Sequence, residues 1–278
     1  MPETSALLSE RHMRLKQCRH GPMLYNVNDV YLGRSLDLYG EYTEDENRFF
    51  SATLGPGSSA VDVGAHIGCH TVFMAKRVGP EGAVFAFEPQ RVIFQNLCAN
   101  LALNGLSNVR VFNAAAGSEE GAITVPDIDY GAEGNFGGVS LGGDDGEQVP
   151  LTTIDGLGLP ACHLIKADVE GMEADVIRGA TETIKTHWPV LYVENDRREK
   201  SPDLIELLLG LDYRLYWHLV SLFNGDNFFG QKNNVFGDIV SLNMIGIPKS
   251  RDQNMTGVTE ITGPQDWPNE PASGAGGA

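Results

Sequence analysis

Cysteine, positive charge and long apolar runs are all scarce in this sequence of 278 residues. Its four cysteines lack C-x-x-C spacing, which argues against a disulfide framework and a structural zinc site, so we expect reduced core residues. No apolar run approaches the roughly 18 to 20 residues that span a bilayer, and the start MPETSALLSE lacks a signal-peptide pattern. We therefore expect a cytoplasmic protein.

The shortage of positive charge argues against two classes of partner. The chain has 37 acidic and 20 basic side chains, a formal net charge of −17, and this field repels nucleic acid phosphates and anionic lipid headgroups. We expect neither nucleic acid nor a membrane as a partner. Hydrophobic residues make up 42% of the chain, which is enough to build a full core.

Composition and periodicity divide the chain into three parts. Residues 1–57 mix polar and apolar segments, end in a Gly-Pro-Gly turn and are interpreted as an N-terminal cap. Residues 58–250 alternate short β-branched runs with helical periods, which is typical of an α/β fold with a doubly wound, mostly parallel sheet. Within them, the glycine-rich segment 118–160 predicts an insertion with a hairpin. Residues 251–278 lack periodicity and predict a disordered tail.

The alternation in the central part predicts individual strands and helices. Strands are expected at 60–63, 83–87, 109–112, 163–167, 190–193, 214–218 and 239–247. Helices are expected at 69–78, 93–101, 176–184 and 204–211. Because right-handed crossovers join consecutive parallel strands, we expect all of these strands in one sheet.

Residues at the carboxyl ends of these strands are the first candidates for a ligand site. The first strand is followed by G-x-x-x-G, at Gly64 and Gly68, and the second by Glu88, whose carboxylate can accept hydrogen bonds from both ribose hydroxyls. A nicotinamide dehydrogenase normally shows G-x-G-x-x-G, and Asp62 before the loop suits a cationic ligand better than a pyrophosphate. The residues favour S-adenosylmethionine (SAM) over NAD. A packing role for the two glycines is the alternative.

Four segments taken together resemble the FkbM family of SAM-dependent methyltransferases. They are VDVGAHIGCHT at 61–71, FEPQ at 87–90, NAAAG at 113–117 and IKADVEGMEADVIRGA at 165–180. The resemblance covers about residues 59–196, and DVEG-x-E at 168–173 is its most specific part. It implies the Rossmann-like fold of class I SAM-dependent methyltransferases and the methylation of a hydroxyl on a glycan or small-molecule metabolite.

The resemblance also implies cofactor contacts for individual residues. The residues implied to bind the methionine end of the cofactor are Asp62, Gly64, Ala65, His66 and Gly68. Glu88 would bind its ribose. Asn113 and Ala114 would lie near its adenine. Asp168 is a further candidate for a cofactor contact. At His66 the family more often has Asn, and both side chains can donate a hydrogen bond.

Methylation of a hydroxyl requires that its proton leave, either to a positioned base or with the help of a metal ion. Asp168, at the end of the fourth predicted strand, can act as a general base or orient the acceptor. Alternatively, it forms a magnesium site with oxygen ligands after the fifth strand, namely Glu194, Asn195 and Asp196. We favour the metal-free interpretation, because the sharp turn after Asp168 leaves one carboxylate aimed at the acceptor.

Two histidines are further catalytic candidates, because imidazole titrates near neutral pH. His70 lies in the first predicted helix and His218 in the sixth predicted strand. His218 precedes an Asn-rich stretch with several phenylalanines, 224–234, and amides beside aromatic faces suit a sugar. A surface loop with a packed aromatic cluster explains that stretch equally well. The alternatives to a methyltransferase are a non-catalytic binding protein with this cofactor fold and, further away, an NAD-dependent oxidoreductase.

Overall fold

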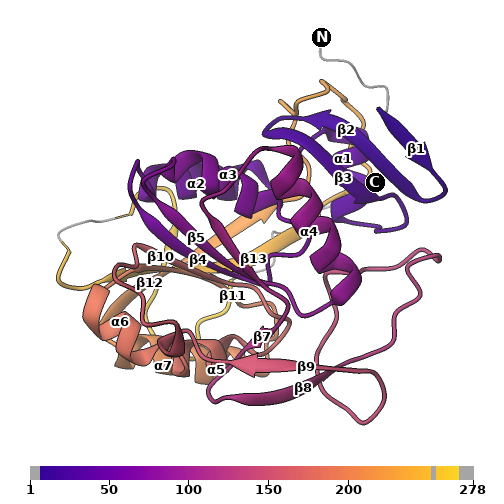
Figure 1. The fold of residues 1–278 in the computed structure, drawn as a ribbon. Helices are drawn as coiled ribbons and strands as arrows, with labels where there is room; N and C mark the ends of the chain where they lie inside the picture. Colours follow the sequence, from indigo (N-terminus) through magenta and orange to yellow (C-terminus); the bar gives the residue numbers. More distant parts are fainter. Residues whose placement is uncertain (1–6, 252–254, 269–278) are drawn as a thin grey trace.

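The computed structural model describes residues 7–251 and 255–268, and its centre is an eight-stranded sheet with helices on both faces (Figure 1). The strands are β1 (Leu8–Glu10), β2 (Met13–Cys18), β3 (Gly21–Asn26), β4 (Ser59–Val63), β5 (Ala83–Phe87), β6 (Val109–Phe112), β7 (Ala115–Ala116), β8 (Gly121–Val125), β9 (Glu147–Thr152), β10 (Leu164–Ala167), β11 (Val190–Glu194), β12 (Tyr213–Ser221), β13 (Val240–Pro248) and β14 (Thr259–Ile261). The helices are α1 (Leu32–Tyr39), α2 (Glu44–Thr53), α3 (Cys69–Val78), α4 (Arg91–Leu103), α5 (Glu173–Arg178), α6 (Thr181–His187), α7 (Ser201–Gly210) and a short 3-10 helix (Asp155–Leu157).

The large sheet has the strand order β14-β12-β13-β11-β10-β4-β5-β6. Neighbouring strands from β11 to β6 are parallel, whereas β13 is antiparallel to both β11 and β12. Every residue of β4 and β10 is buried, as expected for central strands of a parallel sheet with both faces covered. The predicted α/β fold with a doubly wound, mostly parallel sheet is confirmed.

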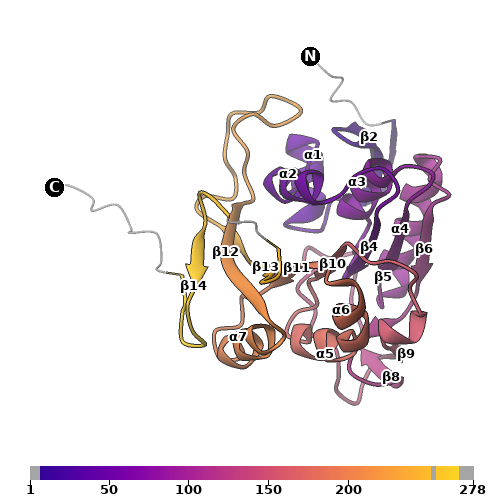
Figure 2. The same ribbon diagram turned by 90° about the vertical axis from the view of Figure 1, so that its left-hand side faces the viewer.

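Two helical layers enclose the sheet, as Figure 2 also shows. On one face, Phe50 of α2 and Met74 of α3 share an apolar cluster with sheet residues such as Val84. On the other face, Ile177 of α5 and Leu208 of α7 pack into the largest apolar cluster. Within the described part of the chain, no helix is long and apolar enough to cross a membrane.

The N-terminal segment forms an antiparallel sheet of β1, β2 and β3, followed by α1 and α2. Asn100 of α4 connects this small sheet to the main domain, because its side chain accepts a hydrogen bond from the Leu24 N–H (2.7 Å) and donates one to the Leu24 carbonyl (3.0 Å). Met23 and Tyr25 of β3 pack in one cluster with Leu97 of α4. The segment is therefore docked on the sheet domain by both polar and apolar contacts.

The glycine-rich segment between β7 and β10 contains an antiparallel strand pair, β8 and β9, in agreement with the predicted hairpin. β7 adds to β9 in parallel and completes a second three-stranded sheet. The helical period at 176–184 forms two short helices, α5 and α6, where one was predicted. A Cβ on Gly179 would lie 1.9 Å from the Gly117 carbonyl oxygen, so this close backbone approach requires glycine where α5 ends.

Part of the segment predicted as a disordered tail is ordered. Thr259–Ile261 forms β14, which pairs antiparallel with β12. Ile261 is buried in the largest apolar cluster, and the Trp267 ring packs edge to face on Trp217 with centroids 5.7 Å apart. A short edge strand needs too few apolar residues to produce a periodic pattern, which is why the sequence did not indicate it. Residues 252–254 and 269–278 of the same segment lie outside the described residues.

This packing predicts a stability effect at Ile261. Ile261→Ala should lower the free energy of unfolding by about 2–5 kcal/mol, because it removes buried methyl groups and leaves a cavity. The same substitution at Ile239, which is 43% exposed, should cost about 1 kcal/mol or less. Urea unfolding of the two variants provides the measurement, and equal costs would show that β14 does not dock on the core.

Candidate active site

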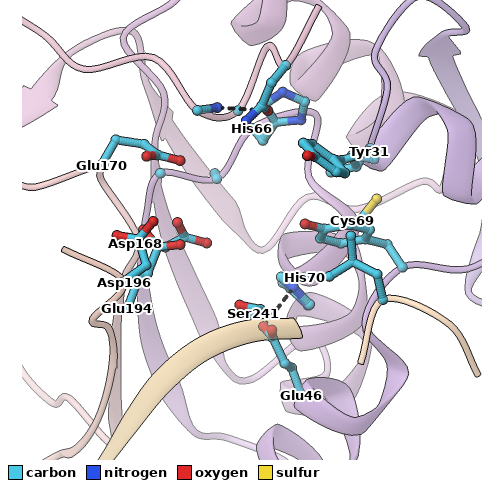
Figure 3. A pocket seen from close by; sticks show the side chains of 18 of the residues that line it. Tyr31, Glu46, His66, Cys69, His70, Asp168, Glu170, Glu194, Asp196 and Ser241 are labelled. Carbon is cyan, nitrogen blue, oxygen red and sulfur yellow. Dashed lines mark hydrogen bonds and ion pairs between the residues drawn. The ribbon is translucent and has the colours of Figure 1, made fainter. Parts of the chain in front are cut away.

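A cavity opens at the carboxyl ends of β4, β5, β10 and β11, where the topology brings the loops of separate strands together. Its volume is about 220 Å³, and a smaller cavity of about 40 Å³ adjoins it. We call them the main cavity and the side cavity. Both are lined by Gly64, Glu88, Gln90, Gly137, Asp168 and Glu170. Figure 3 shows acidic side chains on one side of the main cavity and His66, Tyr31 and His70 on the other.

The turn after β4 depends on glycine at two positions. Gly64 has a φ of +77°, and an added Cβ would lie 1.8 Å from the Asp168 carbonyl oxygen. Gly68, with a φ of +90°, immediately precedes α3. An added Cβ on Gly68 would lie 2.6 Å from Leu97 Cδ1, so both glycines have the packing role given above as the alternative. The turn also brings the start of α3 to the cavity, which suits a polar ligand group.

Glu88 lies at the junction of the two cavities. One carboxylate oxygen accepts the His66 N–H at 3.0 Å, and the other accepts the Gln90 N–H at 2.8 Å. Burial raises the pKa of Glu88 to about 7, although these two N–H groups act in the opposite direction. The backbone thus holds both oxygens in place, and each oxygen has a further lone pair for a ligand hydroxyl.

The His66 side chain points into the main cavity. Neither ring nitrogen has a hydrogen-bond partner among the described residues, and Nε2 lies 3.7 Å from Asp29 Oδ2. Burial lowers the pKa of His66, so the ring is neutral near pH 7. His66 therefore offers one donor and one acceptor to a ligand.

Asp62 lines neither cavity, although it was predicted to contact the cofactor. Its side chain is 0% exposed, accepts a hydrogen bond from Thr71 Oγ1 at 2.7 Å, and pairs with Lys166 Nζ at 3.3 Å. Lys166 Nζ is also 3.3 Å from Asp168 Oδ2. Asp62 is therefore connected to the main cavity through Lys166, which lines it, while its other oxygen binds Thr71 of α3.

The two residues predicted to contact adenine have different positions. Ala114 lines the side cavity. Asn113 lines neither cavity, and its side-chain amide donates to the carbonyls of Glu88 and Pro89, each at 2.9 Å. Asn113 therefore fixes the chain beside Glu88, while the side cavity between Ala114 and Leu141 offers apolar walls for a flat ring.

Four carboxylates at the ends of β10 and β11 or just after them form an acidic rim: Asp168, Glu170, Glu194 and Asp196. One oxygen from each of the first three lies within 4.8 Å of the others. Burial, reinforced by repulsion from the other three carboxylates, raises the pKa of Glu194 well above its usual range. Burial and Asp168 raise the pKa of Glu170 to about 7. Arg197 pairs with Glu170 and, at 3.4 Å, with Asp196.

Asn195 does not belong to the acidic rim, contrary to its prediction as a metal ligand. It is buried on the other side of the strand, where its amide donates to Ser201 Oγ at 2.8 Å. Side chains alternate between the faces of an extended chain, so Glu194 and Asp196 face the cavity and Asn195 cannot. Glu173 also supports the rim, because its carboxylate accepts the N–H groups of Val169 (3.1 Å) and Gly171 (2.9 Å).

The structure separates the two candidate histidines. His70 lines the main cavity, with Nδ1 3.0 Å from Asn47 Oδ1 and Nε2 3.2 Å from Glu46 Oε2. His218, the other predicted catalytic histidine, lines neither cavity. Its Nδ1 lies 2.9 Å from the Tyr192 hydroxyl, and its ring packs beside Phe49 of α2.

The Asn-rich stretch 224–234 also lies away from both cavities. Its amides bind within the protein, for example from Asn224 Nδ2 to Glu41 Oε1 at 2.7 Å. Its Phe228 and Phe229 pack near Gly40, and the preceding Phe223 packs on Tyr39. The packed surface loop, the alternative interpretation of this stretch, agrees with the structure. The neighbouring segment 239–242 lines the main cavity in its place.

Sequence reasoning missed several residues of the site. Asp29, Tyr42 and Glu46 reach the main cavity from the N-terminal segment, and no sequence pattern links them to the strand ends. Lys166 had a recognisable signal, since it is a charged residue in the middle of the apolar run at 163–167. A buried lysine requires a carboxylate partner, so its position in a strand pointed to an ion pair.

The topology and the cavity together define an α/β protein of the Rossmann-like class, with its ligand site at the strand ends and an acidic residue after the second central strand. The model of the methyltransferase FkbM domain matches residues 62–215, more than half of the chain. The chain belongs to the FkbM methyltransferase family.

Similar proteins carry methyltransferase names. The chain is 30% identical over 176 residues to methyltransferase sdnD of Sordaria araneosa, covering 50% of this chain and 66% of that protein. It is 29% identical over 189 residues to methyltransferase 1 of Beauveria bassiana, covering 58% and 74%. Among solved structures it is similar to methyltransferase FkbM from Methylobacillus flagellatus KT, with 18% identity, a TM-score of 0.46, and coverage of 73% of this chain and 50% of that one.

The close approach at Gly64 predicts that Gly64→Ala lowers the free energy of unfolding. Comparison with a second glycine separates the cost of the backbone conformation from the cost of the steric clash. Gly158 is also left-handed, with φ +57° and ψ +47°, but nothing lies within 4 Å of its added Cβ. Gly158→Ala should cost about 1–2 kcal/mol from the backbone conformation alone. Gly64→Ala should cost at least about 3 kcal/mol, because its Cβ also collides with the Asp168 carbonyl. Equal losses of unfolding free energy in guanidinium would contradict this contact.

Proposed function

We propose that the protein is a SAM-dependent methyltransferase that methylates a hydroxyl of a small molecule or a glycan. Family membership supports the reaction class. The observation that carries the cofactor assignment is the position of Glu88, whose two ordered carboxylate oxygens lie between the main cavity and the side cavity. A carboxylate in this position can accept hydrogen bonds from both hydroxyls of a ribose.

The surroundings of Glu88 fit the other parts of SAM. The side cavity, with Ala114, Leu141 and Met172 in its walls, has the apolar lining that an adenine needs. The main cavity continues past the Gly64 turn to Ala65, His66 and the start of α3, where a helix N-terminus and the unpartnered His66 ring suit an amino acid end. We therefore assign the methionine end to Gly64, Ala65 and His66, with Asp62 acting through Lys166. Gly68, which was also predicted to contact the cofactor, lines neither cavity and precedes α3.

When bound, SAM supplies a methyl group on a positively charged sulfur, which becomes a neutral thioether after transfer. The acceptor oxygen forms the new bond to carbon and its proton is lost. The acidic rim is the proposed acceptor side of the cavity: Asp168 orients the hydroxyl, and a rim carboxylate takes up the proton. His70, held by Asn47 and Glu46, is proposed to contribute to the opposite wall.

Glu88 should make cofactor binding depend on pH. Because the pKa of Glu88 is about 7, lowering the pH from 8 to 6 protonates the carboxylate, which can then no longer accept two hydroxyl donors. The affinity for S-adenosylhomocysteine should fall about tenfold over this range. Calorimetry at several pH values measures it.

Glu88→Gln is the control for this pH effect. It should bind S-adenosylhomocysteine about 10- to 100-fold more weakly than the unmodified protein at pH 8, with little pH dependence. Tighter binding of NAD than of S-adenosylhomocysteine by the unmodified protein would refute the cofactor assignment.

Acceptor chemistry is testable with radiolabelled SAM and a panel of polyhydroxylated metabolites and sugars. Label transferred to a hydroxyl forms an ether that survives mild base, whereas label on a carboxylate forms an ester that releases methanol. We expect base-stable product. Asp168→Asn should lower the transfer rate about 10²- to 10⁴-fold with S-adenosylhomocysteine affinity within a few-fold. Cofactor binding without transfer to any acceptor would favour a non-catalytic binding protein.

A further inference from the structure

We propose that Asp168, Glu170 and Glu194 form a binding site for a divalent cation of the magnesium and manganese class. The three side chains come from the ends of two adjacent strands, β10 and β11, and each offers one oxygen to a cluster within 4.8 Å. Oxygens on opposite sides of an ion that is bound at about 2.0–2.4 Å lie about 4.0–4.8 Å apart. The three oxygens therefore lie within the span of a single coordination sphere.

A second feature, independent of this spacing, is the environment of Glu194. Its Oε2 atom is buried and has no hydrogen-bond partner in residues 7–251 and 255–268. A buried carboxylate oxygen without a partner is costly, and such groups normally have a donor or a cation. Glu194 faces the main cavity, beside Asp168 and Asp196 (Figure 3). A cation between the three carboxylates supplies the missing partner.

The basic side chains near the acidic rim do not neutralise the carboxylate of Glu194. Lys166 pairs with Asp168 and Arg197 pairs with Glu170, but within the described part of the chain Glu194 has no ion pair. Arg197 contacts Glu170 through Oε2, so the other carboxylate oxygen can bind an ion at the same time. Lys166 Nζ pairs with Oδ2 of Asp168, so Oδ1 of Asp168 can bind the ion.

The donor set defines the class of ion. Three carboxylates with no nitrogen or sulfur ligand suit a hard cation such as Mg²⁺ or Mn²⁺, whereas zinc sites usually include His or Cys. Three protein ligands leave about three positions of an octahedron for water or hydroxyl oxygens. The further inference that an acceptor hydroxyl takes one of these positions rests on the proposed function; the cation site does not.

Binding of Mn²⁺ to the full-length protein tests the site directly. Electron paramagnetic resonance of free Mn²⁺ should show one bound ion with a Kd of about 1 mM or tighter, which Mg²⁺ displaces. Glu194→Gln should weaken binding at least about tenfold, because it removes one charged ligand. Gln is isosteric and reduces repulsion in the rim, so the thermal midpoint should not fall.

Two controls distinguish ligation from general attraction by negative charge. Asp196→Asn removes a charge from the same rim but none of the three ligands, and should change the Kd by less than about threefold. Glu182→Gln, at a side chain that is 75% exposed on α6, should leave it unchanged. Equal weakening in Glu194→Gln and Asp196→Asn, or no bound Mn²⁺ at about 10 mM, would overturn the proposal.

The same samples separate this proposal from the proposed function. S-adenosylhomocysteine binding is measured by calorimetry with Mn²⁺ and with excess chelator. Cofactor binding without bound Mn²⁺ rejects the cation site alone. Bound Mn²⁺ without cofactor binding supports the cation site and rejects the proposed function.

Discussion

The site depends on the buried ion pairs of Lys166. Its ammonium lies 3.3 Å from both Asp62 Oδ1 and Asp168 Oδ2, and 3.3 Å from the Gly64 carbonyl. Burial alone would lower the pKa of Lys166, but the Asp168 and Asp62 carboxylates raise it above the usual range, so the lysine stays charged. Removing one member of such a group costs about 3–5 kcal/mol, because it leaves a buried charge without a partner. Lys166 therefore holds the loops after β4 and β10 together.

Around this ion pair, the groups that face the cavity also hold the backbone. Glu88 accepts the N–H groups of His66 and Gln90, and the Gly64 turn packs directly against the Asp168 carbonyl. The parts of the wall at Glu88 and Gly64 are thus ordered by contacts within the protein. A ligand that binds there does not have to order these side chains, so less of its binding energy is lost to conformational entropy.

Local patterns predicted the central sheet and its strand-end loops, because both depend on residues close together in the sequence. The G-x-x-x-G turn, Glu88 and Asp168 all reach the cavity as expected. Long-range packing was beyond such patterns: Asp29 and Glu46 arrive from the N-terminal segment, and β14 joins the sheet edge from the far end of the chain. Strand alternation, in contrast, could have excluded Asn195 from the cavity, because its neighbours Glu194 and Asp196 both face it.

The excess of negative charge in the rim has a consequence for methyl transfer under the proposed function. A sulfonium loses its positive charge as the methyl group moves, so an uncompensated negative field stabilises the reactant more than the transition state. Such a rim would bind the cofactor tightly and slow the reaction. Burial and neighbouring carboxylates raise the pKa values of Glu194 and Glu170, which favours the protonated, neutral form of both side chains. Neutralisation of the rim, by protons or by a divalent cation, removes this opposition and leaves the carboxylates free to orient an acceptor.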